Sequence, residues 1–151
     1  MAWRLTRRRR GGTRILDNVI IANGGLGIDL NLDGPTPNDP KDRDNDGNRL
    51  QNFPVLTSAA HAGGQTTIKG KLNAKPNTKF LVQFFVNFPV DGDAQGQQLL
   101  GQQTGLTNKK GNVTFTFRVT PTLDVGNLVT ATATNKQTGD TSEFSASVTV
   151  V

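Results

Sequence analysis

The clearest chemical signal in this sequence is a run of alternating aspartates that ends in a glycine. Asp42, Asp44 and Asp46 alternate along the chain, and Gly47 follows directly. Hard divalent cations such as Ca²⁺ bind several oxygen atoms at about 2.4 Å, and alternate carboxylates before a turn glycine can supply them. The run therefore matches the first half of an EF-hand loop.

The second half of an EF-hand loop is absent from the sequence. At the twelfth position, where that loop has a bidentate glutamate, the chain has Phe53. Asp39, Asn48 or Asn52 would have to complete the ligand shell. The sequence predicts a calcium site formed by the following residues: Asp42, Asp44, Asp46, Asn48 and Asp39. The alternative is a solvated loop, because Asp, Asn and Gly are also common turn residues.

A second group of acids could take part in hydrolysis. Glu143 is the only glutamate in the chain, Asp140 lies shortly before it, and Asp91 lies in a polar loop. A glycosidase needs two carboxyl groups held about 5–10 Å apart across a sugar, so Glu143 with Asp140 or Asp91 is a candidate catalytic pair. No spacing in the sequence requires that pairing, and exposed acids in turns are the more common case.

Residue counts exclude several other chemistries. The chain has no cysteine and a single histidine, His61. Thiol nucleophiles, zinc–thiolate sites and multi-histidine metal sites within one chain are therefore excluded. No Gly-x-Ser-x-Gly motif accompanies His61, which we interpret as a loop residue. These counts favour a protein that is not an enzyme.

The formal charge of +5 originates at the N-terminus. Six of the 17 basic residues lie in the first 14 positions, whereas residues 15–151 carry 11 basic and 12 acidic groups. A block of like charges predicts a disordered basic tail over residues 1–14. Because no basic stripe is evident beyond the tail, the sequence argues against nucleic-acid binding. We predict neither a membrane span nor an export signal, since no long apolar run occurs.

Composition favours an all-β fold. Gly, Thr, Asn and Val are abundant, whereas Glu and Met occur once each, and such a chain favours strands over helices. From residue 53 onward, strand patterns alternate with turn signals at intervals typical of sandwiches. The sequence predicts a seven-stranded immunoglobulin-like β-sandwich over residues 53–151, preceded by a short N-terminal β extension. An antibody-type domain is not expected, because the cysteine pair and the core tryptophan are missing.

Two apolar patterns define the expected core strands. The central strand is expected over residues 80–88, where one face carries Phe80, Val82, Phe84, Val86 and Phe88. Phe85, on the opposite face, could combine with Phe88 into an aromatic platform for sugars. The last strand is expected over residues 141–151, with its core face formed by Phe144, Ala146, Val148 and Val150.

Four segments, taken in order, resemble one class of bacterial proteins. They are residues 23–30 (Asn-Gly-Gly-Leu-Gly-Ile-Asp-Leu), 50–56 (Leu-Gln-Asn-Phe-Pro-Val-Leu), 70–78 (Gly-Lys-Leu-Asn, then Pro-Asn-Thr) and 129–145 (Val-Thr-Ala-Thr-Ala, then Thr-Ser-Glu-Phe-Ser). Over residues 15–151 the chain resembles the C-terminal end of large exported proteins of the CSLREA-domain type, which are built on right-handed parallel β-helices.

This resemblance implies a division into parts. Residues 15–52 would form the last β-helix coil and an Asp-rich loop, and residues 53–151 the immunoglobulin-like domain. In that class many coils precede the position of Ile15, so the chain is expected to be a detached terminal module. The resemblance also implies a secreted or cell-surface location and no defined activity.

The leading hypothesis is a non-enzymatic, calcium-stiffened structural or adhesion module of an exported bacterial protein. The alternatives are a carbohydrate-binding module and a small polysaccharide or ester hydrolase that uses Glu143 and nearby aspartates. The expected partners are a polysaccharide or a surface protein, and exposed strand edges could support a homo-oligomer.

Overall fold

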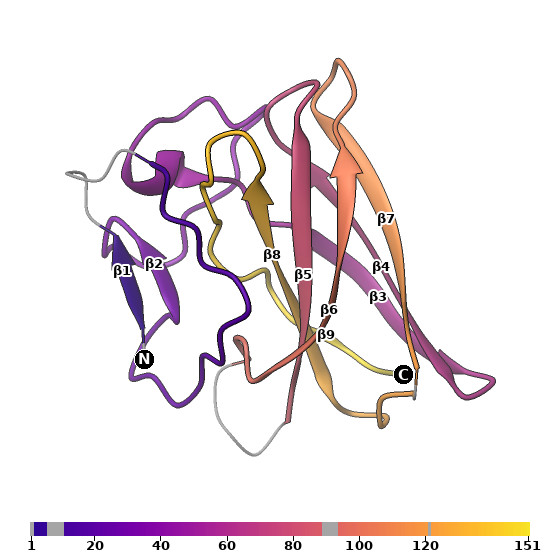
Figure 1. Ribbon diagram of the computed structural model, residues 1–151. Coiled ribbons are helices and arrows are strands. Elements are labelled where there is room, and N and C mark those ends of the chain that lie inside the picture. Colours follow the sequence, from indigo (N-terminus) through magenta and orange to yellow (C-terminus); the bar gives the residue numbers. More distant parts are fainter. Residues whose placement is uncertain (1, 6–10, 89–93, 121) are drawn as a thin grey trace.

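The computed structural model describes residues 2–5, 11–88, 94–120 and 122–151 and has an all-β fold. Two sheets pack face to face as a sandwich (Figure 1). The strand order in one sheet is β3 (Val55–Ala62), β4 (Gln65–Asn73) and β7 (Asn112–Val119). In the other sheet it is β6 (Gln98–Leu106), β5 (Lys79–Asn87), β8 (Leu128–Asn135) and β9 (Val148–Thr149). The predicted all-β sandwich is confirmed.

The strands form where apolar and polar residues alternate. On β4, Ile68 and Leu72 are buried, whereas Lys69 and Lys71 between them are exposed. Such alternation places one set of side chains in the core and the other in water.

The central strand β5 is buried on both faces. One face packs against the other sheet, where Phe84 contacts Phe117. On the opposite face, Gln83 bonds Asp17 of the N-terminal segment and Phe85 packs on Phe144.

Aromatic rings fill the centre of the sandwich. Phe84 on β5 stacks on Phe117 of β7 with ring centroids 4.5 Å apart, and it meets Phe115 edge-on at 5.5 Å. These contacts join the two sheets across the core, where aromatic pairs add to the gain from apolar burial. Phe88, expected on the same face as Phe84, lies beyond the end of β5 and is exposed.

The C-terminal segment differs from the single long strand that the alternation predicted. Only Val148–Thr149 forms strand β9. Upstream, Ser142 and Ser145 pair with β8 in an unusual way, because both the backbone and the hydroxyl of each serine take part. The Ser142 N–H donates to the Ala133 carbonyl, and the Ser142 Oγ accepts from the Ala133 N–H, both at 2.9 Å. Ser145 bonds Ala131 in the same manner, at 2.8 and 3.0 Å.

The N-terminal residues form a cap against the sandwich, which we define as residues 2–5 and 11–52. Strand β1 (Trp3–Leu5) pairs in parallel with β2 (Ile28–Leu30), and a short 3₁₀ turn spans Gly47–Leu50. The prediction of a disordered tail over residues 1–14 is therefore wrong for residues 2–5 and 11–14, while Arg7–Arg10 lie outside the described residues. The physical reason is a second apolar cluster, formed by Leu5, Ile15, Ile20, Ile28 and Leu30.

Candidate functional site

Three aspartates of the cap converge on one point. Asp39, Asp42 and Asp44 each present a carboxylate oxygen, and these oxygens all lie within 4.8 Å of one another. We call these residues the acidic cluster. All three side chains are half-buried, and both Lys41 and Asp42 have a positive φ, of 66° and 55°. This left-handed turn folds the loop back so that Asp39 meets the two later aspartates.

Asn52 holds the acidic cluster in place. Its backbone N–H donates to Asp42 Oδ1 at 2.9 Å, and its Oδ1 accepts from the Asp39 N–H at 3.1 Å. Its side-chain amide donates to the carbonyls of Asp39 (2.6 Å) and Asn73 (2.8 Å). Asn73 ends strand β4 and accepts at its Oδ1 from the Lys41 N–H at 2.8 Å. The cluster is thereby bound to the edge of the sandwich.

Charge repulsion and burial make the acidic cluster unfavourable when it is fully ionised. Burial, together with the neighbouring carboxylates of Asp44 and Asp39, raises the pKa of Asp42 to about 7, against a hydrogen bond from Asn52 that lowers it. Burial and the charges of Asp39 and Asp46 raise the pKa of Asp44 to about 6. Asp44 Oδ1 is also buried without a hydrogen-bond partner among the described residues. A divalent cation would offset the burial of these carboxylates and their mutual repulsion, and it would give Asp44 Oδ1 a partner.

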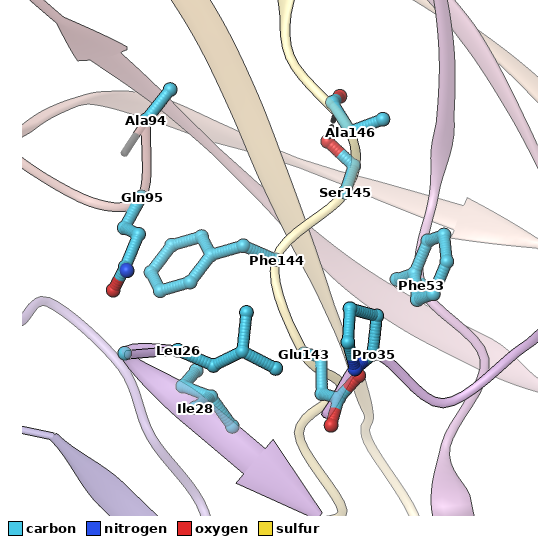
Figure 2. Close-up of a pocket in the computed structure, with 11 residues that line it drawn as sticks. Leu26, Ile28, Pro35, Phe53, Ala94, Gln95, Glu143, Phe144, Ser145 and Ala146 are labelled. Atoms are coloured by element: carbon cyan, nitrogen blue, oxygen red, sulfur yellow. Dashed lines mark hydrogen bonds between the residues drawn. The ribbon is translucent and has the colours of Figure 1, made fainter. Parts of the chain in front are cut away.

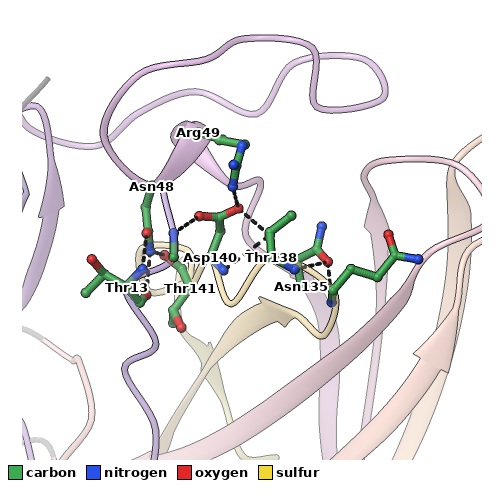
Figure 3. Close-up of polar contacts among 9 residues, drawn as sticks. Thr13, Asn48, Arg49, Asn135, Thr138, Asp140 and Thr141 are labelled. Carbon is green, nitrogen blue, oxygen red and sulfur yellow. Dashed lines mark hydrogen bonds and ion pairs between the residues drawn. The ribbon is translucent and has the colours of Figure 1, made fainter. Parts of the chain in front are cut away.

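The structure does not bring every predicted metal ligand to this cluster. Asp46 Oδ2 instead accepts from the Asn31 side-chain amide at 3.5 Å. Asn48 is fully buried and bonds the N–H and the carbonyl of Thr13 (2.9 and 2.8 Å) and the carbonyl of Thr141 (2.9 Å) (Figure 3). The prediction that Asn48 completes the ligand shell is wrong, because its amide is committed to joining the cap to the sandwich.

Asp140, a predicted catalytic candidate, also holds the fold together. It is only 1% exposed and forms an ion pair with Arg49 (Figure 3). It accepts further hydrogen bonds from the Gly12 N–H at 2.6 Å and from the Thr138 hydroxyl. One carboxylate thus links the N-terminal segment, the Asp-rich loop and the β8 hairpin turn.

Glu143 has a comparable role on the other side of the cap. It is 3% exposed, and its two carboxylate oxygens accept the N–H groups of Leu30 and Thr36, both at 2.8 Å. Burial raises the pKa of this carboxyl above its ordinary value, although these hydrogen bonds oppose the shift. Glu143 lines a mainly apolar cavity of about 270 Å³ between the cap and the C-terminal segment (Figure 2). Asp91, the other catalytic candidate, lies outside the described residues.

Two further sequence expectations need correction. Phe85 is 3% exposed and packs edge-on against Phe144 at 5.4 Å. It therefore cannot form an aromatic platform with the exposed Phe88. His61, interpreted as a loop residue, lies on β3, where its N–H donates to the Val151 carbonyl at 2.8 Å.

Sequence reasoning missed the residues that join the cap to the sandwich. No local sequence pattern indicated the structural roles of Arg49, Asn48 and Asn52, because Asn and Arg are ordinary residues of polar loops. Their partners, such as Thr141 for Asn48, lie 93 positions away. One indirect signal was available in the composition. Glu143 is the only glutamate in a chain with many aspartates, and in the structure it is buried and accepts the Leu30 N–H.

The described part of the chain contains no helix that could span a membrane. No protein-family model matches the chain, and no curated protein is significantly similar to it. Among solved structures, one that was matched to this chain is described as "Biofilm associated protein - BSP domain". The two chains are 20% identical with a TM-score of 0.44, and the match covers 72% of this chain and 17% of that chain. This likeness is too distant to carry a function across.

Proposed function

We propose that this chain is a non-enzymatic structural module of an exported bacterial protein, stiffened by calcium bound at the acidic cluster. The observation that carries the proposal is the convergence of Asp39, Asp42 and Asp44 within 4.8 Å. Three carboxylates can provide up to six oxygens, and Ca²⁺ accepts irregular arrangements of six to eight oxygen ligands that include water. Mg²⁺ fits less well, because it demands near-octahedral geometry and gives up its water reluctantly.

The position of the cluster explains how a cation would stiffen the module. The Asp-rich loop, residues 33–52, connects strand β2 of the cap to strand β3 of the sandwich. At one end of the cluster, Asn52 bonds both the Asp39 carbonyl and the Asn73 carbonyl. A cation held there would fix the loop against the sandwich, so the cap and the sandwich would move as one body.

The acids considered for hydrolysis support a structural role. Asp140 and Glu143 both direct their carboxylate oxygens to backbone N–H groups or to Arg49. A general acid or nucleophile has to be available to a substrate, whereas these groups are occupied in holding the cap. Their burial is the reason for preferring a structural module over the hydrolase alternative.

The location in an exported protein rests on the resemblance and on the form of the cap. β1 and β2 pair in parallel with the register Trp3–Ile28 to Leu5–Leu30. Parallel neighbours joined by a single long connection are the arrangement that successive coils of a parallel β-helix adopt. This geometry is consistent with the proposal that the cap is the end of such a helix.

Thermal unfolding with and without calcium tests the proposal. At about 100 times its Kd, a ligand that binds only the native state adds about 2.7 kcal/mol, which corresponds to a rise in Tm of roughly 5–10 °C. Extracellular modules bind Ca²⁺ with Kd values of about 0.1–1 mM, so 10 mM Ca²⁺ is roughly 10 to 100 times Kd, and at the weaker end the rise in Tm is about half as large. Unfolding in 10 mM Ca²⁺ should be compared with EDTA and with 10 mM Mg²⁺. An unchanged midpoint in calcium would refute the calcium site.

A matched pair of variants ties the effect to the cluster. Asp44→Asn removes a cluster ligand, whereas Asp33→Asn removes an exposed carboxylate in the same loop. We expect Asp44→Asn to lose most of the calcium-induced rise and Asp33→Asn to keep it. Equal responses of the two variants would place the bound calcium elsewhere.

A further inference from the structure

The outer face of the three-stranded sheet carries positive charge and no acid. Lys69 and Lys71 on β4 and Arg118 on β7 are exposed, and we call this group the basic face. It corrects the expectation that no basic stripe lies beyond the tail, because only the pairing of β4 with β7 brings Arg118 near the two lysines. Their neighbours Ile68, Gly70 and Leu72 are buried, so the charged side chains point away from the core. Strands β3, β4 and β7 contain no Asp or Glu.

The register of the sheet places a hydroxyl beside each charge. Lys69 pairs with Thr116, Lys71 with Thr114, and Arg118 with Thr67. Residues two apart on a strand are separated by about 7 Å, so the pairs form successive rows across β4 and β7. Each of these rows therefore holds one cation and one threonine.

Among the described residues, no ion pair neutralises the charge on this face, although Asp39 lines the same surface pocket as Lys71. None of the ion pairs in the described part of the chain involves Lys69, Lys71 or Arg118. Between Asp46 and Asp124 the sequence contains only two acids, Asp91 and Asp93. Soluble surfaces usually mix charges of both signs, and a patch of a single sign attracts a partner of the opposite sign.

We propose that the basic face binds an anionic polysaccharide whose repeating carboxylates meet the two lysines and the arginine. The threonine hydroxyls would hydrogen-bond the sugar hydroxyls between those carboxylates. A single-stranded nucleic acid fits this face less well, because its binding relies on exposed aromatic rings. Phe115 and Phe117 of β7 instead face Phe84 in the core. The inference names a partner for the exported module proposed above and rests on that location.

The test measures binding of the full chain to fluorescently labelled hyaluronan oligosaccharides at low salt. A face variant, Lys69→Gln/Lys71→Gln/Arg118→Gln, should lose about tenfold or more in affinity, since three exposed ion pairs are removed. A control variant, Lys75→Gln/Lys79→Gln/Lys136→Gln, removes three exposed lysines from outside this face and should keep the wild-type affinity. Thermal melts establish that both variants are folded.

A third variant distinguishes a polysaccharide partner from general attraction of polyanions. Thr67→Val/Thr114→Val/Thr116→Val keeps every charge and the β-branched shape but removes the hydroxyls. We expect it to bind hyaluronan several-fold more weakly while its affinity for a DNA duplex stays unchanged. Unchanged hyaluronan affinity in this variant would overturn the assignment to a polysaccharide.

Two other outcomes would overturn the basic face itself. One is the absence of wild-type binding at low salt, and the other is an equal loss in the face and control variants. Each titration is repeated in EDTA and in 10 mM Ca²⁺. Lys71 lines a surface pocket together with Asp39 of the acidic cluster, but the proposed contacts to the polysaccharide use the three cations and no bound calcium. A failed calcium site would therefore leave the binding in EDTA intact, so the two proposals fail separately.

Discussion

Replacing Asp42 by asparagine should stabilise the chain in the absence of calcium and weaken its response to calcium. Burial raises the pKa of Asp42 from 3.8 to about 7. A carboxyl with a raised pKa stabilises the fold fully below its unfolded pKa, and this contribution is lost as pH rises through the folded pKa. In EDTA the wild-type chain should therefore lose stability as the pH rises from about 4 to about 7. Asparagine keeps an oxygen for the Asn52 N–H but carries no charge.

The size of the effect follows from that pKa. Each pH unit between 3.8 and about 7 corresponds to about 1.4 kcal/mol, which sets an upper bound of about 4 kcal/mol at pH 8. Asp42 is only half-buried, so solvent screening reduces the expected gain to about 2 kcal/mol. For a chain of 151 residues, this gain corresponds to a rise in Tm of about 4–8 °C.

The assay is differential scanning calorimetry of wild type, Asp42→Asn and Asp33→Asn at pH 5 and pH 8, each in EDTA and in 10 mM Ca²⁺. In EDTA at pH 8 the order of Tm should be Asp42→Asn above wild type, and in calcium the gap should close or reverse. Asp33→Asn should follow wild type throughout. A lower Tm for Asp42→Asn in EDTA, with an undiminished calcium response, would refute the electrostatic reasoning.

Three further substitutions test the contacts that hold the fold. Glu143→Gln replaces an acceptor of two N–H groups by an amide that also donates. The free energy of unfolding should therefore fall by about 2 kcal/mol. An unchanged thermal melt would exclude the role of Glu143 as a clamp. Asn48→Ala removes three hydrogen bonds from a fully buried side chain; we expect a loss of about 2–4 kcal/mol and faster hydrogen exchange at Thr13. Phe84→Ala leaves a cavity between the sheets and should cost about 3–5 kcal/mol in urea unfolding.

The strands of the sandwich could be predicted because their signals are local. On β4 the alternation of Ile68, Lys69, Gly70 and Lys71 already separates core from solvent. A side chain's face on a strand depends only on its immediate neighbours along the chain. The strand predicted over residues 141–151 does not form at residues 141–147, because serine hydroxyls there accept the β8 N–H groups that carbonyls would accept in a regular strand pair. The alternation of apolar and polar residues does not show that a hydroxyl will replace a carbonyl as the acceptor.

The candidate site was predicted only in part. The sequence identified an Asp-rich loop with cation chemistry, and the structure brings Asp39, Asp42 and Asp44 together. It directs Asp46 to Asn31 instead. The alternation of aspartates along a loop does not determine where their side chains point. A loop has no regular backbone conformation, and Lys41 and Asp42, for example, both take a left-handed one.

By itself, the sequence determined the fold class, the position of the acid-rich loop and the distribution of charge, since each depends on composition or on near neighbours. Only the tertiary structure decided which acids meet, that Trp3–Leu5 pairs with Ile28–Leu30, and that Glu143 clamps a backbone 113 positions away. Contacts between such distant residues form only when the whole chain has folded. Their free energy comes from burial and from paired polar groups, which no local pattern encodes.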